Sequence, residues 1–535
     1  MQQFRGNGIV DGVATGTVFF CGKDAVARVG IEDPEAELKL YQQAKASAKE
    51  ELSALYEKAL TESGKESAAI FEVQQLLIED GGYNASVASI IWNERVCAGY
   101  AVQKSGEKYA AVLEAMDDPL FAQRAADVKD VTGRLLRILN GGRKTEEAGE
   151  NVILAAEELT PSDVFLFERS RMRGLVTAQG TAESHAAILA RTMDIPMISG
   201  IEVNSSWNGK TAAVDGGSGS FILEPDDEVL KELKEDQRRQ AERKTALLKL
   251  KGKPSVSRDG KQLRICVNIG STLDLPAVRE NDAEGIGLFR SEFLYMEQQT
   301  APSEEIQYKA YREAAEKADG RSVVIRTFDL GADKQAGFEQ AEAEKNPALG
   351  YRGIRISLRE PEAFHTQLRA ILRAALCGDV SILFPMIISA DEFRQCKKHV
   401  EEAKEELRKN GVPYKEDVKL GVMIETPAAA VISEMLAKEA DFFSIGSNDL
   451  AQYTLALDRG DPKLEDLRDP HHPAVLKLIR LSIENAHKHG IPVSVCGELA
   501  ADMTLTQTFL DYGVDSLSVS PAMILPLREA VRNCM

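Results

Sequence analysis

The second half of the chain alternates short apolar segments with longer segments of helical spacing. From about residue 260 onward we identify eight apolar segments, at 264–269, 285–289, 323–327, 381–384, 420–424, 442–445, 493–496 and 516–519. Such repetition is typical of a parallel sheet covered by helices. Eight is the number that closes the sheet into a (β/α)8 TIM barrel, whose reactive residues lie at the carboxyl ends of the strands. We therefore expect a (β/α)8 barrel over residues 256–535.

The first half shows a helical block that interrupts a strand-rich region. Residues 8–20 are rich in glycine and β-branched residues, helical spacing dominates from about 33 to 142, and strand patterns return at 151. We expect a small α/β domain made of two segments, with a helical bundle inserted between them. The expected boundaries are 1–24 and 146–225 for the α/β domain, 25–145 for the bundle and 226–255 for a helical linker.

Composition narrows the class of protein. A chain of 535 residues is expected to hold several domains, and a net charge of −19 argues against a nucleic-acid binder. The seven cysteines show no paired metal-binding spacing, and neither a leader-like N-terminus nor a long uncharged apolar run occurs. These features predict a cytoplasmic protein with reduced thiols.

His185 lies where a helix is expected to begin. It follows Gly180 and Ser184, and the alanine-rich stretch at 186–190 favours a helix for which Ser184 is the cap. The positive end of the helix dipole favours an anion, and an imidazole there can accept a phosphoryl group as a nucleophile. A single histidine is more often a packing residue, so the phosphoryl interpretation depends on a partner site elsewhere in the chain.

Such a partner site is expected where the barrel strands end. Cations, carboxylates and one thiol follow the strands or lie in the next loops: Arg290, Glu292, Arg326, Asp329, Lys334, Arg352, Glu425, Asn448, Asp449, Arg459 and Cys496. Arginine forks fit phosphate and carboxylate oxygens, and paired carboxylates such as Glu425 and Asp449 suit Mg²⁺. Nearby cations are expected to lower the pKa of the Cys496 thiol, which can then take part in proton transfer. Structural ion pairs would explain one such arginine, but the whole set favours a phosphate-bearing carboxylic acid with Mg²⁺.

Short motifs at the same places resemble a known family. They read GIGLFRSEFLYM at 285–296, VIRTFDLG at 324–331, NPALGYR at 346–352, MIETPA at 423–428, FFSIGSNDL at 442–450, DRG at 458–460 and CGE at 496–498. In sequence and in order they resemble enzyme I of the bacterial phosphoenolpyruvate:sugar phosphotransferase system, and the resemblance spans nearly the whole chain.

This resemblance implies a multidomain α/β fold: a swivelling phosphohistidine domain, an inserted helical domain that docks the carrier protein HPr, and a barrel that binds phosphoenolpyruvate (PEP). His185 would take the phosphoryl group of PEP and pass it to a histidine of HPr, with release of pyruvate. By motif position, PEP would be bound by Arg290, Arg326, Arg352, Asn448, Asp449 and Arg459. Mg²⁺ would be held by Glu425 and Asp449, and Cys496 would protonate the enolate. Supporting roles fall to Ser184, Lys334, Met423 and Thr160, the last as a hydrogen-bond partner of the active histidine.

The implied partners are HPr and a second copy of the chain, which would pair through the barrel. An acidic helical surface is expected to meet a basic face of HPr, with Glu66, Glu72, Glu79 and Asp80 as candidates. Neither nucleic acid nor a membrane is expected as a partner.

One departure from the family pattern leaves an alternative open. The segment before His185 reads Gly-Thr-Ala-Glu-Ser at 180–184, where the family has Gly-Gly-Arg-Thr-Ser, so Glu183 adds a negative charge there. A regulatory paralogue that has lost transfer or uses another acceptor is therefore the rival function. Pyruvate phosphate dikinase and PEP synthase share the histidine and the barrel, but no segment offers the glycine-rich loop of their ATP-binding domain.

The other histidines have no expected role. His365, His399, His487 and His489 are expected at solvated helix positions, and His471 and His472 in a surface loop.

Overall fold

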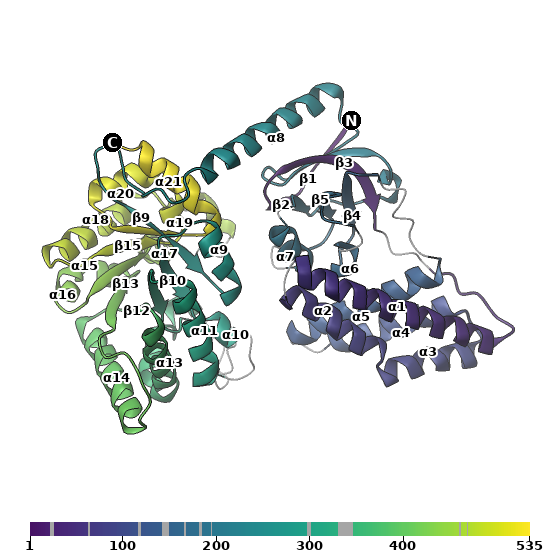
Figure 1. The fold of residues 1–535 in the computed structure, drawn as a ribbon, viewed down its shortest axis with the longest axis horizontal. Helices are drawn as coiled ribbons and strands as arrows, with labels where there is room; N and C mark the ends of the chain where they lie inside the picture. Colours follow the sequence, from purple (N-terminus) through teal and green to yellow (C-terminus); the bar gives the residue numbers. More distant parts are fainter. Residues whose placement is uncertain are drawn as a thin grey trace. The chain divides into compact units, whose positions relative to one another are not determined.

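The computed structural model describes residues 1–21, 26–62, 65–115, 119–141, 149–164, 167–180, 184–193, 195–296, 301–329, 346–458, 462–467 and 469–535. The chain forms two compact units, Met1–Arg243 and Lys244–Met535 (Figure 1). No helix in these described ranges is both long and apolar enough to cross a membrane.

The N-terminal unit contains a mixed eight-stranded sheet in the order β1-β8-β7-β3-β4-β5-β6-β2. The strands are β1 (Gln2–Arg5), β2 (Asn7–Val10), β3 (Val13–Phe20), β4 (Val152–Ala156), β5 (Met172–Thr177), β6 (Met197–Ser199), β7 (Thr211–Asp215) and β8 (Ser220–Leu223). The strands from β3 to β6 pair in parallel, and the outer pairings are antiparallel. Along β4, Val152 and Leu154 join one apolar cluster while Ile153 and Ala155 join another. Because side chains alternate along a strand, β4 is covered on both faces.

Helices interrupt this sheet between β3 and β4, as the sequence predicts. They are α1 (Pro34–Glu62), α2 (Lys65–Ile78), α3 (Gly81–Glu94), α4 (Ala98–Glu114) and α5 (Pro119–Leu139). Within this bundle α1 packs along α2 and α4 along α5 (Figure 1). Tyr83, Val87 and Ile91 of α3 lie four residues apart and are all buried. The same apolar spacing that predicts a helix therefore also predicts which face of it is buried.

Two short helices follow β4, and the second begins at His185. α6 (Pro161–Val164) packs against α7 (His185–Thr192). A longer helix, α8 (Asp227–Leu248), crosses the boundary between the two units.

The C-terminal unit is a closed barrel of parallel strands in the order β10-β11-β12-β13-β14-β15-β16-β9, which confirms the predicted fold. The strands are β9 (Arg264–Ile269), β10 (Ile286–Arg290), β11 (Ser322–Arg326), β12 (Asp379–Phe384), β13 (Lys419–Ile424), β14 (Phe442–Gly446), β15 (Val493–Cys496) and β16 (Ser516–Val519). Leu288, Leu383 and Met423 pack together inside the barrel.

Helices surround this barrel (Figure 1). The longer ones are α11 (Glu304–Lys317), α13 (Pro361–Ala374), α14 (Ala390–Lys409), α18 (Pro473–Lys488) and α21 (Ile524–Asn533). The shorter ones are α9 (Leu275–Glu280), α10 (Phe293–Met296), α12 (Ile354–Arg359), α15 (Pro427–Val431), α16 (Ser433–Ala437), α17 (Ser447–Leu455), α19 (Glu498–Ala501) and α20 (Thr506–Tyr512). Local signals fix their starts: Ser389 and Glu392 form a reciprocal cap at the start of α14.

Candidate active site

His185 lies at a helix N-terminus in the first unit. It is the first residue of α7, and the Ser184 hydroxyl caps this helix by accepting the backbone N–H of Ala187 at 3.3 Å. Gly180, just upstream, has φ +122°, a conformation that favours glycine. The description of His185 covers its backbone alone, and residues 181–183, which carry the departures from the family pattern, lie outside the described residues.

Thr160 lies at the start of the neighbouring helix. Its hydroxyl donates to Asp163 Oδ2 at 2.8 Å, and the Asp163 backbone N–H donates to the same hydroxyl at 3.2 Å. These bonds cap α6, which packs against α7. The hydrogen bond expected between Thr160 and the active histidine stays a prediction.

In the barrel, Arg326 and Arg352 share the carboxylate of Asp329. Arg326 ends β11; its Nη1 lies 3.1 Å from Asp329 Oδ2, and its Nη2 donates to Glu292 Oε1 at 2.8 Å. Arg352 donates to both Asp329 oxygens, through Nε at 3.2 Å and Nη2 at 2.9 Å, and its Nη1 lies 3.4 Å from Asp449 Oδ1. The buried Nε of Arg326 has no hydrogen-bond partner among the described residues. This pair therefore keeps donor capacity for an anion.

Glu425 is a buried carboxylate with one unpartnered oxygen. The residue is 1% exposed, and its Oε1 accepts the backbone N–H of Met386 at 2.6 Å. Its Oε2 has no hydrogen-bond partner within the described part of the chain. Burial, followed by the negative charges of Asp329 and Asp449, raises the pKa of Glu425 to about 8. A Cβ on Gly446 would lie 2.9 Å from Oε2, so the glycine leaves room at this oxygen.

These carboxylates fit a divalent cation that prefers oxygen ligands. A cation between Glu425 and Asp449 would satisfy the unpartnered oxygen and offset the repulsion that raises the pKa of Glu425. Met386, which orients Glu425, has φ +59°, a strained conformation for a residue with a side chain. Strain of this kind is common at functional sites, where surrounding structure holds it in place.

The thiol of Cys496 is buried close to these charges. Cys496 ends β15 and is 2% exposed; Ser444 Oγ donates to its Sγ at 3.6 Å, and its Sγ donates to the Ile445 carbonyl at 3.4 Å. Burial raises the pKa of this thiol, which corrects the lowered pKa expected from the sequence. The nearby cations Arg326 and Arg290 do act to lower the pKa of the thiol, but the effect of burial outweighs them. The raised pKa keeps this thiol protonated at neutral pH, so the group could donate a proton rather than act as a thiolate nucleophile.

Gly497 lets the chain pass close to Asn448. Its φ is +94°, and a Cβ there would lie 2.5 Å from Ser447 Oγ and 2.7 Å from Asn448 Oδ1. Asn448 Oδ1 accepts the Glu498 backbone N–H at 2.9 Å, and Asn448 Nδ2 donates to Glu498 Oε1 at 3.3 Å. The hydrogen bonds between Asn448 and Glu498 thus link the segment after β14 to the segment after β15.

The remaining predicted residues divide into placed and unplaced ones. Arg290 ends β10, is exposed, and forms no ion pair with any described residue. Met423 is buried inside the barrel, and Arg326 Nη1 lies 3.8 Å from its sulfur. Lys334 and Arg459 lie outside the described residues.

Sequence reasoning missed the role of two residues. It placed Asp329 at a strand end but did not anticipate an acceptor shared by two arginines. It did not single out Tyr453, whose hydroxyl accepts from Arg352 Nη1 at 3.1 Å and donates to the Ala348 carbonyl. Tyr453 follows Asp449 by four residues on α17, so helical spacing places both on one face and was the available signal.

Two histidines expected at solvated positions are not solvated. The side chains of His365 on α13 and His399 on α14 are only 14% and 17% exposed. Both lie in the groove between the two helices, where the ring nitrogens His365 Nε2 and His399 Nδ1 are 2.9 Å apart. The apolar pattern of each helix could not reveal this contact, because it depends on how the helices pair.

Three family models match the chain, one after another. They are described as PEP-utilising enzyme, N-terminal (residues 5–124), mobile domain (148–219) and PEP-binding domain (244–535). The fold and the barrel site accordingly define a PEP-utilising enzyme, a class with a general requirement for a divalent metal.

Full-length relatives narrow this class. The phosphoenolpyruvate-protein phosphotransferase of Bacillus subtilis (strain 168) is 40% identical over 537 residues, which cover 99% of this chain and 94% of that protein. Proteins of the same name from Staphylococcus carnosus (strain TM300) and Enterococcus faecalis (strain ATCC 700802 / V583) are each 37% identical, again over 99% of this chain and 94% of their own length. The chain belongs to the phosphoenolpyruvate-protein phosphotransferase family, and it is a phosphotransferase, as the motifs predicted.

Proposed function

We propose that this enzyme takes the phosphoryl group of PEP onto His185, releases pyruvate, and passes the group to a histidine of an HPr carrier in the first step of sugar uptake. The observation that carries the proposal is the set of polar groups at the carboxyl ends of the barrel strands, which we call the barrel mouth. There the Arg326–Arg352 pair, the unpartnered oxygen of Glu425 and the protonated thiol of Cys496 come together. A phosphate, a divalent cation and an enolate each find a suitable group in this set.

PEP binding is assigned to the cations and the amide at the mouth. Glu292 and Asp329 orient Arg326 and Arg352. The donors that remain for an anion include Arg326 Nε, which has no partner among the described residues, and the exposed Arg290. Asn448 adds an amide held in place by Glu498. Asp449, Arg459 and Lys334 complete the proposed set.

Glu425 and Asp449 would hold Mg²⁺. Bound there, the ion supplies neutralisation of phosphate charge. The protein's own contribution is a cradle of fixed shape, in which Met386 orients one Glu425 oxygen and Gly446 leaves room at the other.

The proposed transfer breaks the bond between phosphorus and the enol oxygen of PEP and forms one from phosphorus to a ring nitrogen of His185. The Cys496 thiol gives its proton to the methylene carbon of the enolate, which yields pyruvate, and the thiolate recovers a proton from water. Ser444 orients the thiol, and the packing of Met423 against Arg326 fixes the guanidinium. Ser184 and Thr160 cap the two helices that position the His185 backbone.

Division of labour between segments is part of the proposal. Residues 1–24 and 146–225 would carry the phosphohistidine, 25–145 would dock HPr, 226–255 would link, and 256–535 would bind PEP. His185 and the proposed PEP residues belong to different compact units, and we propose that the histidine segment moves between donor and acceptor.

The HPr-docking surface would include the acidic residues Glu66, Glu72, Glu79 and Asp80. Glu79 already forms ion pairs with Lys45 at 2.8 Å and Lys49 at 3.0 Å, so its charge is partly neutralised. Asp80 accepts the Tyr83 backbone N–H at 2.7 Å as the cap of α3. The side chain of Glu66 lies outside the described part of the structure. Among the other three, exposed Glu72 would attract a basic partner most directly. We further propose a cytoplasmic dimer paired through the barrel.

The test is phosphoryl labelling of the full chain. Purified protein is incubated with PEP labelled in its phosphate and with Mg²⁺, with and without HPr, beside His185→Ala. Acid-labile label that appears on the wild type, is absent from the variant and chases onto HPr supports the proposal. Label that stays on His185 points to another acceptor. No label would favour a regulatory protein that binds PEP, with Glu183 beside His185 as the first residue to revert to threonine.

A further inference from the structure

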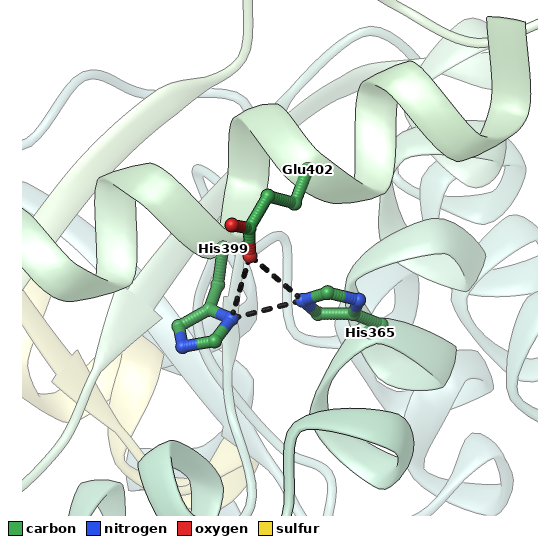
Figure 2. Close-up of side chains that lie close together, drawn as sticks. All are labelled: His365, His399 and Glu402. Atoms are coloured by element: carbon green, nitrogen blue, oxygen red, sulfur yellow. Dashed lines mark hydrogen bonds and ion pairs between the residues drawn. The ribbon is translucent and has the colours of Figure 1, made fainter.

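Two histidines and a glutamate converge between helices α13 and α14, on the outside of the barrel. His365 comes from α13, and His399 and Glu402 come from successive turns of α14 (Figure 2). His365 Nε2 lies 2.9 Å from His399 Nδ1 and 3.4 Å from Glu402 Oε2, and His399 Nδ1 lies 3.2 Å from the same oxygen. One atom from each side chain therefore points at a common centre.

These spacings suit a small tetrahedral ion. Zinc bonds of roughly 2.0–2.1 Å in tetrahedral geometry separate neighbouring ligand atoms by about 3.3 Å. The three observed separations, 2.9, 3.2 and 3.4 Å, lie around that value. The side chains would need only a slight spread to admit the ion, and a water molecule would complete the shell on the solvent side, where Glu402 is partly exposed.

A second carboxylate fixes the orientation that a metal needs. The other ring nitrogen of His365, Nδ1, lies 2.8 Å from Glu406 Oε1. Glu406 is held in turn by Arg369, whose Nη1 donates to its second oxygen at 2.5 Å. A carboxylate at Nδ1 keeps a proton on that nitrogen and leaves the lone pair of Nε2 facing the centre, as in the carboxylate–histidine–zinc arrangement.

Neighbouring side chains hold the second ring and the carboxylate in place. The Phe364 ring packs edge-on against His399, with centroids 5.5 Å apart. Lys398 pairs with Glu402 through Oε1 at 3.4 Å, so Oε2 is the oxygen that faces the centre.

We propose that His365, His399 and Glu402 form a binding site for Zn²⁺ that joins helices α13 and α14 and stabilises the barrel. Two imidazoles and one carboxylate select zinc-like transition metals over Mg²⁺, which prefers an all-oxygen shell. The site is separate from the carboxylates at the mouth, and its existence does not depend on the proposed phosphoryl transfer. Zinc bound to the native state would raise thermal stability by an amount that grows with the logarithm of the free zinc concentration divided by its Kd.

The experiment titrates Zn²⁺ into the chelator-stripped full chain against a chromophoric competitor, with excess Mg²⁺ present to occupy oxygen sites. We expect one equivalent to bind and the unfolding temperature to rise. Co²⁺ in place of Zn²⁺ should give the visible absorption of a tetrahedral ion. Glu406→Gln should weaken binding about 10-fold, and His399→Gln by about 100-fold or more.

His487→Gln is the matched control, because His487 lies on α18 with a single carboxylate, Asp515, 3.1 Å away. Its zinc affinity should equal that of the wild type. Circular dichroism and the rate of PEP-dependent labelling show whether each variant is folded, since none of these residues belongs to the active site. Failure of the wild type to bind an equivalent of Zn²⁺, or equal affinity in His399→Gln, would overturn the proposal.

Discussion

The buried carboxylate of Glu425 is held in a setting that opposes its charge. It packs near Asp329 and Asp449, and one of its oxygens has no hydrogen-bond partner among the described residues. Ionisation of this carboxyl opposes folding at neutral pH, because burial raises its pKa to about 8, and the proposed cation would compensate for that cost.

Glu425→Gln is expected to weaken metal binding and, at the same time, to stabilise the fold. Loss of a metal ligand should raise the Mg²⁺ concentration needed for labelling of His185, with a fall in rate of about 100-fold at low Mg²⁺. Without metal at pH 7, the free energy of unfolding should rise by about 1 kcal/mol or more. The pKa of Glu425 is raised to about 8 by burial, so the wild type must take up a proton on folding, whereas the amide need not. Labelling rates against Mg²⁺ and calorimetry in a chelator check the two halves. An unchanged Mg²⁺ dependence would remove Glu425 from the metal site.

Asp127 on α5 predicts a pH effect on the helical insertion. Burial raises the pKa of its carboxyl to about 6, whereas an aspartate in an unfolded chain titrates near 3.9. Between these values folding takes up a proton, so the stability contributed by this group is lost as the pH rises through the window. The unfolding temperature of Asp127→Asn should therefore exceed that of the wild type by an amount that grows from pH 4 to 6 and is constant above. A difference that is equal at every pH would contradict the assignment.

Single residues show where inference from sequence succeeds and fails. Position after an apolar run was enough to place Arg326, Glu425 and Cys496 at the carboxyl ends of barrel strands, while their roles stay predictions. The direction of the Cys496 pKa could not be predicted, because it depends on burial rather than on neighbours in sequence. The same holds for His365 and His399, whose contact arises from the pairing of two helices.

At the scale of elements, apolar runs located the barrel strands to within about two residues. The observed ends differ because backbone pairing between strands does not stop where the apolar run stops. Thus β12 begins at Asp379 rather than 381, because Asp379 still pairs with Ser322 of β11. Turn glycines carry information that spacing alone does not give. The glycine of the CGE motif is required because β15 turns into α19 against Asn448.

Gly497→Ala should be damaging in a way that its control is not. A Cβ at Gly497 would meet Ser447 and Asn448, whereas Gly490, with φ +71°, has nothing within 4 Å. Both alanines carry a conformational cost of about 1 kcal/mol. Only Gly497→Ala should also slow PEP-dependent labelling, by about 10-fold or more, because it displaces Asn448. Labelling rates normalised to folded protein test this, and equal activity in both variants would show that the close approach has no catalytic role.

At the scale of the whole molecule, α8 is the element that crosses from one compact unit to the other. Its surface is highly charged, with Arg238 and Glu242 paired one turn apart and both exposed. We expect this charged helix to act as a semi-rigid connection between the two units.

Replacing Arg238 and Arg239 together by glycine should soften the connection, since each glycine lowers helix stability by about 1 kcal/mol. PEP affinity, measured by calorimetry, should not change, because the barrel residues are untouched. The rate at which His185 is labelled, measured by rapid quenching, should fall several-fold. The double alanine variant removes the same charges but keeps the helix, and it should retain the wild-type rate. A loss of equal size in both variants would assign the effect to charge.

The burial of the Cys496 thiol should protect the activity of the enzyme under oxidative stress. Peroxides and alkylating reagents attack thiolates that they can reach, and this sulfur is both protonated and 2% exposed. The half-buried Cys97, Cys377 and Cys534 should be modified well before it. Mass spectrometry during peroxide treatment should therefore show oxidised peptides while labelling activity persists. A cell that meets an oxidative burst would then keep the phosphotransferase activity of this enzyme until the barrel itself opens.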